Sequence, residues 1–246
     1  MDKNKVVIVT GGSSGIGAAT GNLLYESGYN VMLAARDEAK LKKIVRAVES
    51  RENKIDYCVT DVSKAPQVSH LVARTLDKFG HLDVLLNNAG IMPNSPISEG
   101  KLSQWQEMVD VNLIGVLNGI ATVMPIFKKQ KGGQIISTSS VAAFRHYPNA
   151  GIYGATKAAV KYLMESIRLE SATEHTNIRA TSIYPGAINT ALPQTIQSPQ
   201  IRKQTEKFHA KIAIDPLAVA KVIKFAIEQP AEVDVSELSV YPTMQI

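Results

Sequence analysis

Residues 6–28 place a strand, a glycine-rich turn and a helix in direct succession, and this restricts the fold more than any other stretch. Residues 6–9, Val-Val-Ile-Val, are continuously apolar and β-branched, which predicts a strand covered on both faces. They lead into residues 10–17, Thr-Gly-Gly-Ser-Ser-Gly-Ile-Gly, and a helical pattern follows to about Ser27 and is closed by Gly28. Such a turn admits a phosphate, and the helix N-terminus offers it free N–H groups. Because the spacing Gly-x-x-x-Gly-x-Gly differs from the commonest dinucleotide fingerprint, a glycine turn without a ligand is the alternative.

The alternation of apolar strand and helix continues along the chain. Further strands are expected at residues 31–35, 55–60, 82–86, 134–138, 181–184 and 235–240. Further helices are expected at residues 37–52, 63–79, 102–129, 153–169 and 216–228, and the polar segment 191–211 is expected to be a mobile lid. This order predicts an α/β fold of the Rossmann type, a doubly wound, seven-stranded, mostly parallel sheet with helices on both faces. No repeat or linker divides the chain, so residues 1–246 are expected to form a single dinucleotide-binding and catalytic domain.

Composition argues against several classes of protein. The 246 residues are 45% hydrophobic and 20% charged, which is typical of a soluble globular protein. The net charge of +5 is dispersed without a block of Lys or Arg, so no nucleic-acid partner is expected. The single cysteine, Cys58, excludes an intrachain disulfide and is interpreted as a buried strand thiol rather than a nucleophile. No metal site is expected.

Targeting and membrane signals are not apparent in the sequence. The N-terminus passes directly into the first strand without the apolar region of a secretory signal. The charge-free stretch 111–127 contains Asn112 and Asn118 and is marginal in length and too polar for a membrane span. A buried or interface helix is the better interpretation, and the cytoplasm is the expected location.

The end of the second strand bears on the choice of cofactor. In dinucleotide-binding folds, an acidic residue about 20 positions past the glycines binds the ribose 2′-OH, whereas an Arg accommodates a 2′-phosphate. Here the strand ends in Arg36, whose guanidinium suits a phosphate. NADP is therefore expected in preference to NAD. The alternative is that Arg36 is solvated and that Asp37 turns to the ribose.

Two further strand ends carry polar or small residues that suit a cofactor. Asp61, followed by Val62, is placed to accept a hydrogen bond from an adenine amino group or to cap the next helix. Residues 87–90, Asn-Asn-Ala-Gly, suit close backbone approach by a ligand, although a plain loop has the same composition. In parallel α/β sheets, ligands bind outside the carboxyl ends of the strands.

Tyr153 and Lys157 stand four residues apart, so a helix brings them to one face. A cation beside a phenol lowers its pKa from about 10, and such a phenol can transfer a proton near neutral pH. Alone, the pair is a weak signal, because most such pairs are a half-buried Tyr and a solvated Lys. The helix is expected to bury a stripe of apolar and small residues. That stripe comprises Ala155, Ala158, Ala159, Tyr162, Leu163, Ser166 and Leu169.

Two more polar residues stand near this pair or on a predicted buried face. Ser140 follows the fifth strand and precedes Tyr153 by 13 residues, and the loop between them is placed to cover a substrate. His146 in that loop is interpreted as solvated rather than as a base. Asn112 falls on the apolar stripe of the helix 102–129 and needs hydrogen-bond partners, from the local backbone or from a site.

Taken together, these motifs resemble the short-chain dehydrogenase/reductase family, in its compact single-domain branch, over the entire chain. The matching features are the turn 10–17, residues 87–90, Asn112, Ser140, Tyr153-x-x-x-Lys157, and Pro185-Gly186 with Thr190. The ending Glu237-Leu238 and Pro242-Thr243-x-Gln245 is similar to that of NADP-dependent, clavulaldehyde-type reductases. Many NADP users also carry Lys or Arg just before the second motif glycine, where this chain has Ser14.

The resemblance implies a catalytic set of Asn112, Ser140, Tyr153 and Lys157. Tyr153 would exchange a proton with the substrate oxygen, Ser140 would hydrogen-bond that oxygen, Lys157 would lower the phenol pKa and bind the nicotinamide ribose, and Asn112 would hold a relay water. The implied cofactor contacts are Gly11, Ser13, Ser14, Gly15, Ile16, Gly17, Arg36, Asp61, Val62, Asn88, Ala89, Gly90, Tyr153, Lys157, Pro185, Gly186, Ile188 and Thr190. A homo-oligomer, tetramer or dimer, through the long helices is also implied.

The expected function is that of an NADP(H)-dependent carbonyl reductase or alcohol dehydrogenase acting on a small ketone, aldehyde or alcohol. A non-catalytic NADP(H) sensor on the same fold is the alternative, although such sensors often lose the Tyr or the Lys. The residues expected to line the substrate pocket are apolar or modestly polar, which favours a fairly apolar carbonyl compound. They are Met92, Asn94, Val141, His146, Tyr147, Ala187 and Leu192.

Overall fold

Seven strands form one sheet in the computed structural model, which describes residues 4–48 and 54–245. The strands are β1 (Val6–Thr10), β2 (Asn30–Ala35), β3 (Ile55–Val59), β4 (Val84–Asn87), β5 (Gly133–Thr138), β6 (Ile178–Pro185) and β7 (Glu237–Val240). Their order is β3-β2-β1-β4-β5-β6-β7, and every pairing is parallel. The predicted Rossmann-type sheet is confirmed. The strand order reverses between β1 and β4, the position at which such sheets bind ligands.

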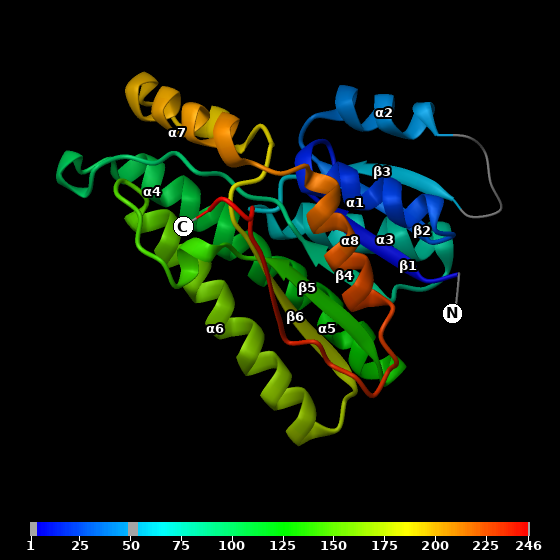
Figure 1. Cartoon of the computed structure of the whole chain (residues 1–246). Coiled ribbons are helices and arrows are strands. Elements are labelled where there is room, and N and C mark those ends of the chain that lie inside the picture. The colour runs from blue at the N-terminus through cyan, green and yellow to red at the C-terminus, as the bar shows by residue number, and fades with distance from the viewer. Residues whose placement is uncertain (1–3, 49–53, 246) are drawn as a thin grey trace.

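Helices cover both faces of the sheet (Figure 1). They are α1 (Gly15–Glu26), α2 (Glu38–Ala47), α3 (Ala65–Phe79), α4 (Leu102–Val109), α5 (Gly115–Gln130), α6 (Gly151–Glu174), α7 (Pro199–Ile212) and α8 (Pro216–Ile227). One core cluster joins the sheet to α3, α5 and α6, and the other joins it to α1, α2 and α8. Successive strand residues such as Ile8 and Val9 enter opposite clusters, because neighbouring side chains of a strand point to opposite faces.

A π-helical turn, Asp110–Ile114, joins α4 to α5. The helix expected at 102–129 is therefore present, but it is not regular throughout. Asn112 lies inside the π turn and is fully buried. The buried row Met108, Asn112, Val116 and Ile120 runs through the irregular turn.

Helix α6 turns a different face to the core from the one that its apolar pattern predicted. Tyr162 is 80% exposed and Leu169 is 52% exposed, whereas Val160 and Met164 are buried. The buried stripe also contains the polar residues Thr156, Lys157 and Ser171, which a pattern of apolar residues does not count. The predicted helix was right, but the predicted buried face was wrong.

Two other segments differ from their expected form. Residues 191–211 contain a short 3₁₀ turn, Leu192–Thr195, and most of helix α7, so this segment is more regular than a structureless lid. Helix α2 ends at Ala47 because Val48 adopts an extended backbone, and the rest of the predicted helix, residues 49–52, lies outside the described residues.

The continuous helical segment Leu102–Gln130 is long and apolar enough to span a membrane by length and composition, with a mean hydropathy of 1.6 in its most apolar window. That test is weak evidence, because the core helix of an α/β protein also passes it. Val123 and Phe127 of α5 are fully buried against the sheet, while Ile114 and Leu117 on another side are partly exposed. Since 33% of that window is buried, one side of the segment packs in the core and the rest of its apolar surface is uncovered.

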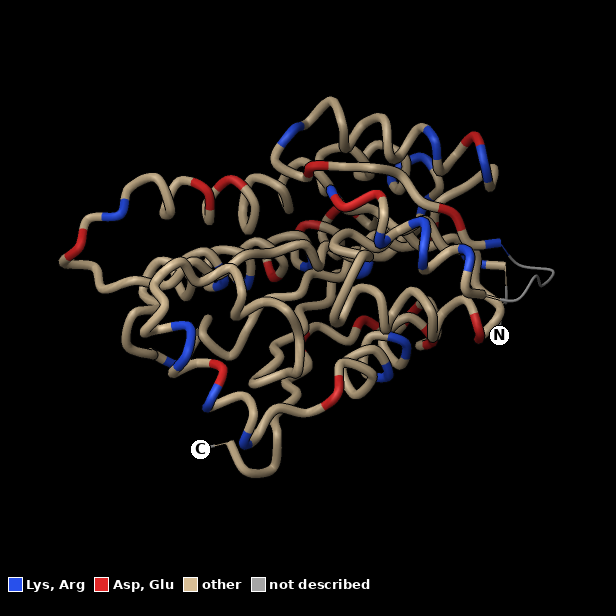
Figure 2. Tube along the Cα trace, turned by 90° about the horizontal axis from the view of Figure 1, so that it is seen from above, with Lys and Arg blue, Asp and Glu red and all other residues tan. Residues whose placement is uncertain are grey.

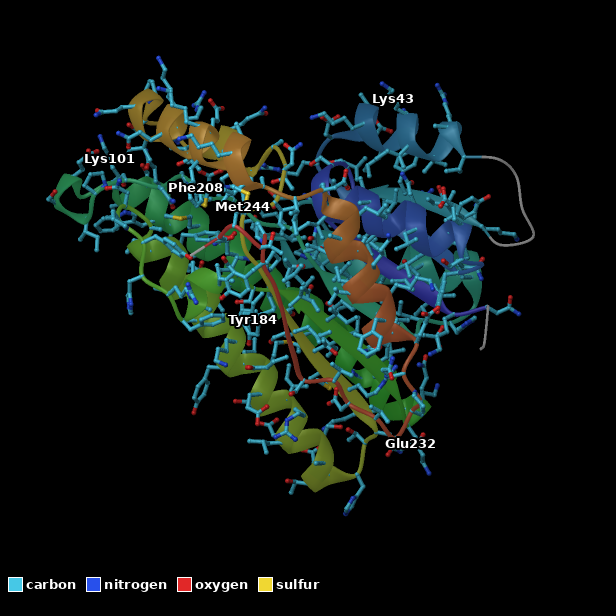
Figure 3. The ribbon with its side chains drawn as sticks, in the orientation of Figure 1. Lys43, Lys101, Tyr184, Phe208, Glu232 and Met244 are labelled. Carbon is cyan, nitrogen blue, oxygen red and sulfur yellow. The ribbon has the colours of Figure 1, made fainter. Side chains whose placement is uncertain are left out.

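The amino end of the sheet is closed by polar groups of the chain itself. The guanidinium of Arg179, at the start of β6, donates to the Gln134 side chain at 2.9 Å and to carbonyls at and beyond the end of α8. Asp234 accepts from the Ala180 amide, and Asp83 accepts from the Val6 amide at 2.7 Å. Glu232 marks this end of the molecule, opposite Phe208 and Met244 (Figure 3).

Candidate active site

A cleft of about 610 Å³ opens at the carboxyl ends of the strands. Every cofactor position expected from the sequence lines it except Gly17. These are Gly11, Ser13, Ser14, Gly15, Ile16, Arg36, Asp61, Val62, Asn88, Ala89, Gly90, Tyr153, Lys157, Pro185, Gly186, Ile188 and Thr190. Gly17 lies beneath the turn, where a Cβ would overlap the Gly11 carbonyl oxygen. Residues that are far apart in the sequence are thus gathered at one cleft.

The glycine-rich turn forms one end of the cleft and leaves the start of α1 open. Gly15 has φ +52°, and a Cβ there would lie 2.9 Å from Thr190 Cγ2, so both its conformation and its surroundings favour glycine. Ser14 occupies the N-cap position of α1 without making a side-chain cap. The first N–H groups of this helix are therefore available to an anion.

Two cations and one carboxylate stand beside the end of β2. Arg36, Asp37 and Lys40 all line the cleft. Asp37 accepts from the Lys40 amide at 3.0 Å as the N-cap of α2, and it pairs with the Lys40 ammonium at 3.0 Å. The Lys40 amide and ammonium lower the pKa of the Asp37 carboxyl. The carboxylate is thus engaged by its own helix, whereas Arg36 is exposed at the cleft.

The middle of the cleft is held together by Thr10 and Asn88. The Thr10 hydroxyl donates to the Leu86 carbonyl and accepts from the Asn88 amide at 2.9 Å. The Asn88 side chain donates to the Thr10 carbonyl and accepts from the Thr138 hydroxyl. These bonds fix the carboxyl ends of β1, β4 and β5 relative to one another. Asp61 accepts from the amide and hydroxyl of Ser63, which makes a local turn ahead of α3.

Ser140, Tyr153 and Lys157 meet where the cleft passes β5 and α6. Tyr153 and Lys157 lie on the buried face of α6, with the ammonium 5.7 Å from the phenol ring centroid. The Ser140 hydroxyl hydrogen-bonds the Tyr153 phenol and accepts from the Ala142 amide at 3.1 Å. The Lys157 ammonium donates to the Thr138 carbonyl at 2.8 Å. A hydroxyl, a phenol and an ammonium thus converge on one place in the cleft.

Burial dominates the acid–base properties of this pair. Burial raises the pKa of Tyr153 to about 12, against a lowering by the hydrogen bond from Ser140. Burial lowers the pKa of Lys157 to about 8. The expected lowering of the phenol pKa by the cation is not seen: burial is the main cause of both shifts, and the Lys157 ammonium donates to the Thr138 carbonyl.

Asn112 lies behind the cleft rather than in its wall. Its side-chain oxygen accepts from the Ile91 amide, and its side-chain nitrogen donates to the Ile91 carbonyl, both at 2.9 Å. The nitrogen also donates to the Thr156 hydroxyl, which donates to the Tyr153 carbonyl. A Cβ on Gly90 would stand 3.3 Å from Asn112 Oδ1 and 3.6 Å from Lys157 Nζ. Asn112 therefore fixes the backbone that faces Lys157.

The residues expected to line a substrate pocket are scattered. Leu192 lines the cleft, whereas Met92, Asn94, Val141 and Ala187 are buried outside its lining. His146 is exposed, and Tyr147 is half-buried and accepts a hydrogen bond from Gln245 at 3.5 Å.

Some cleft residues were missed by sequence reasoning, notably Lys40, Gln194, Thr195 and His209. The Thr195 hydroxyl accepts from the Met92 amide at 2.8 Å, which joins the 3₁₀ turn to the loop after β4. Burial lowers the pKa of His209, while a hydrogen bond to the Ile188 backbone raises it. Lys40 could have been predicted because it stands four residues after Arg36 in the sequence. His209 is a lone histidine in a polar segment, and nothing in the sequence indicated that it lines the cleft.

Comparison with known proteins agrees with this fold. The family model for short chain dehydrogenases matches residues 5–201. The Listeria monocytogenes protein named Uncharacterized oxidoreductase Lmo0432 is 47% identical over 243 residues, which cover 99% of this chain and 98% of that protein. The chain belongs to the short-chain dehydrogenase/reductase family. It is therefore an oxidoreductase.

Two solved structures of the same fold were obtained with different cofactors. An alcohol dehydrogenase from Thermococcus sibiricus, complexed with 5-hydroxy-NADP, matches with a TM-score of 0.86 and 28% identity over 98% of each chain. A short chain dehydrogenase/reductase from Burkholderia phymatum, in complex with NAD, matches with a TM-score of 0.88 and 25% identity. That alignment covers 96% of this chain and 88% of the other. The similarity to known structures thus leaves both cofactors open.

Proposed function

We propose that the protein is an NADP(H)-dependent carbonyl reductase or alcohol dehydrogenase, with residues 1–246 acting as a single dinucleotide-binding and catalytic domain. The observation that carries this proposal is the meeting of Ser140, Tyr153 and Lys157 in the cleft that begins at the glycine-rich turn. A binding protein needs the turn, but it has no need of a phenol and an ammonium beside it. The C-terminal ending Pro242-Thr243-x-Gln245 supports placement with the clavulaldehyde-reductase-like members.

The cleft suits a dinucleotide along its length. The open start of α1 would hold the pyrophosphate, Asp61 and Val62 would face the adenine, and Ile188 and Thr190 would hold the nicotinamide carboxamide. A Cβ at Gly15 would lie against the Thr190 side chain. The glycine-rich turn and the loop 186–190, here called the nicotinamide loop, therefore approach closely enough to enclose a narrow ligand. When bound, the nicotinamide supplies or accepts the hydride.

Tyr153 is the proposed general acid in reduction and general base in oxidation. Its hydroxyl would give a proton to the carbonyl oxygen, or take one from the alcohol, while the Ser140 hydroxyl donates to the same oxygen. Lys157 would bind the ribose hydroxyls and, as a cation, favour the phenolate in the transition state. We infer that Asn112 acts through the backbone that it fixes at Ile91, beside which a relay water would stand next to Lys157.

Arg36 and Lys40 support a preference for NADP over NAD. Both line the cleft beside β2, where a ribose 2′-phosphate would lie. Asp37, the alternative ribose ligand, is occupied as the cap of α2 and as the partner of Lys40. Lys40 supplies a second cation in a chain that has Ser14 at the usual basic position of the turn.

The proposed substrate is a small, neutral ketone or aldehyde, or the matching alcohol. Among the described residues, Ile91, Val111 and Leu192 give the cleft apolar lining, and Gln194 and Thr195 add uncharged polar groups. Apart from Lys157, the described Lys and Arg side chains of the lining are Arg36 and Lys40, which lie beside β2 at the end of the cleft where adenosine would bind. A phosphorylated or carboxylated substrate would therefore lack an evident cationic partner.

We also propose that the protein works in the cytoplasm as a homo-oligomer, a tetramer or a dimer. Ile114 at the end of the π turn and Leu117 of α5 are partly exposed, and Tyr162 and Leu169 are exposed on α6. Apolar side chains gathered on long helices are suited to contact with a second copy. Basic and acidic residues are interspersed along the described trace, which does not favour a nucleic-acid partner (Figure 2).

The test is the initial rate of NADPH and of NADH oxidation with a panel of neutral aldehydes and ketones. Faster turnover with NADPH supports the proposal, whereas a preference for NADH keeps the reaction and overturns the argument from Arg36. Tight NADPH binding without turnover of any carbonyl compound, in a folded protein, would favour the alternative of a non-catalytic sensor.

A further inference from the structure

The segment after β7 returns to the cleft. β7 pairs with β6 so that Val240 stands opposite Pro185, and the Gly186 amide donates to the Val240 carbonyl at 2.8 Å. A turn closed by the Gln245 amide and the Pro242 carbonyl then ends the described chain. Figure 1 shows this red segment running beside β6 towards the end of the molecule that holds α4 and α7.

The side chain of Gln245 joins two loops of the site. Its oxygen accepts from the Ala187 amide at 2.8 Å, and its nitrogen donates to the Tyr147 hydroxyl at 3.5 Å. Ala187 follows Gly186, which lines the cleft, and precedes Ile188, which also lines it. Tyr147 lies in the loop between Ser140 and Tyr153. One amide group therefore contacts both the proposed nicotinamide loop and the loop that leads to the catalytic tyrosine.

Gly186 is shaped to this contact. A Cβ at Gly186 would overlap Gln245 Oε1, and it would stand 3.2 Å from Pro242 Cδ. Gly186 is not among the glycines with positive φ, so its conformation does not itself require glycine. The need for glycine at this cleft position arises from the close approach of the C-terminal segment.

Two ring contacts hold the same arrangement. The Arg145 guanidinium lies over the Tyr241 ring at 5.3 Å, and the Phe144 ring meets the Tyr184 ring edge-on with centroids 5.3 Å apart. The loop before Tyr153 thus contacts the C-terminal segment through Arg145 and β6 through Phe144. Gln245 of the C-terminal segment also contacts the nicotinamide loop.

We propose that Gln245 is a positioning residue of the active site, which sets the 186–190 loop against the 144–147 loop so that nicotinamide and carbonyl meet in register. This rests on the proposed function. Because Gln245 does not contact the glycine turn or Arg36, its loss should misplace the reacting groups and leave most of the cofactor affinity intact. A misplacement of about 1 Å can cost up to about a hundredfold in rate.

The first test compares Gln245→Ala with Met244→Ala, since Met244 is the neighbouring residue and is 69% exposed. We expect Gln245→Ala to lower kcat about tenfold and to change the NADPH dissociation constant less than about twofold. Met244→Ala should match the wild type, and Gln245→Glu, which keeps the acceptor, should recover kcat to within about threefold. An unchanged kcat in Gln245→Ala, or an equal loss in Met244→Ala, overturns the proposal.

The second test uses the clash at Gly186. Gly186→Ala should lower kcat about a hundredfold, because the new methyl group displaces Gln245 or the loop. In the double variant with Gln245→Ala, activity should return to within about threefold of Gln245→Ala alone, because the overlapping atoms are gone. Independent effects would instead multiply to about a thousandfold loss, and that result would contradict the proposed coupling.

Amide hydrogen exchange over residues 186–190 separates this inference from the proposed function. Gln245→Ala should expose the Ala187 amide and speed exchange there at least about fivefold, and Met244→Ala should not. If Gln245→Ala speeds this exchange but the wild-type protein reduces no carbonyl compound, the proposed function is wrong while the contact is real. Normal wild-type turnover with unchanged exchange in Gln245→Ala would mean that Gln245 does not hold the loop.

Discussion

The two ends of the parallel sheet each bury a cation, and they treat it differently. At the amino end, Arg179 donates to Gln134 and to several carbonyls near the end of α8, and Asp234 offsets part of the cost of its burial. At the carboxyl end, the Lys157 ammonium has the Thr138 carbonyl as its hydrogen-bond acceptor among the described residues, although an ammonium has three protons to donate. Both terminal nitrogens of the Arg179 guanidinium have acceptors within the chain, whereas the Lys157 ammonium keeps bonding capacity at the cleft.

This difference separates stability from function within one architecture. The polar groups at the amino end form hydrogen bonds with one another, so that end of the sheet needs no ligand to be stable. At the carboxyl end, the open start of α1 and the Lys157 ammonium have capacity that a ligand can meet. Substitutions at the amino end should therefore change the free energy of unfolding, and substitutions at the cleft should mainly change turnover.

The largest expected effect is the loss of activity in Tyr153→Phe, which removes the only atom of the side chain that can transfer a proton. We expect kcat to fall about a thousandfold, within the usual range for a general acid or base, with the melting temperature nearly unchanged. Steady-state rates and calorimetry measure both quantities. Tyr162→Phe, at an 80% exposed position of the same helix, is the control. Substantial activity in Tyr153→Phe would assign proton transfer to another group.

The second prediction is that Arg179→Ala lowers the free energy of unfolding by about 3 kcal/mol, because buried carbonyls and Gln134 lose their donor. Turnover per folded molecule should stay within about twofold of the wild type. Denaturant unfolding gives the first quantity, and rates corrected for the folded fraction give the second. Arg168→Ala, which breaks a solvent-exposed pair with Glu165, should lower the free energy of unfolding far less than Arg179→Ala does. A loss of turnover in folded Arg179→Ala would contradict the assignment of the amino end to stability alone.

The third prediction concerns stability against pH. Burial lowers the pKa of Lys157 from 10.5 to about 8, so between these values the unfolded chain binds more protons than the folded protein. This contribution to stability is present above pH 10.5 and is lost as the pH falls through 8. The wild type should therefore gain about 2 kcal/mol from pH 7.5 to 9.5 through this one group.

Lys157→Met should lack that gain, and Lys161→Met, at a more exposed ion pair with Glu237, should keep it. Denaturant unfolding at the two pH values measures the difference. The raised pKa of Tyr153 acts in the opposite direction, but only as the pH rises from 10 to 12, above this window. An equal gain in stability in the wild type and in Lys157→Met would show that the pKa of Lys157 is not lowered in the folded protein.

The smallest expected effect is at Arg36 and Lys40, which are exposed beside the end of β2. Arg36→Ser and Lys40→Ser should each raise KM for NADPH about tenfold and leave KM for NADH within about twofold, because only NADPH has the 2′-phosphate. Lys43→Ser, on the same helix but away from the cleft lining (Figure 3), is the control. Equal changes for both cofactors would place these cations elsewhere on the dinucleotide.

Sequence reasoning predicted the sheet well because buried parallel strands are continuous apolar runs, such as Val6–Val9, that few other structures explain. It predicted the gathering of the turn, Arg36 and Asn88 because the carboxyl ends of parallel strands meet at one edge. Sequence reasoning predicted the wrong buried face of α6. The face that is buried carries the polar residues Thr156 and Lys157, which break the apolar periodicity. Function thus obscured the pattern that folding alone would have produced.

Other parts of the site could not be predicted because they depend on how elements are oriented in space. Lys40 looks like any solvated helix cation until the axis of α2 is known. Met92 and Ala187 occur in the right loops, but the side chains turn into the core. Gln245 is distant in sequence from the 186–190 loop, and only the parallel pairing of β7 with β6 brings it there.

The π turn at Asp110–Ile114 corrects the phase of a long helix. Four residues rotate a regular α-helix by about 400°, so three such steps, from Met108 through Asn112 and Val116 to Ile120, would carry the last side chain about 120° around the axis. The wider turn absorbs part of this drift and keeps the whole row buried. Deleting one residue between 110 and 114 would therefore act as a rotation of about 100°, which either turns Asn112 away from Ile91 or swings the apolar face of α5 off the sheet.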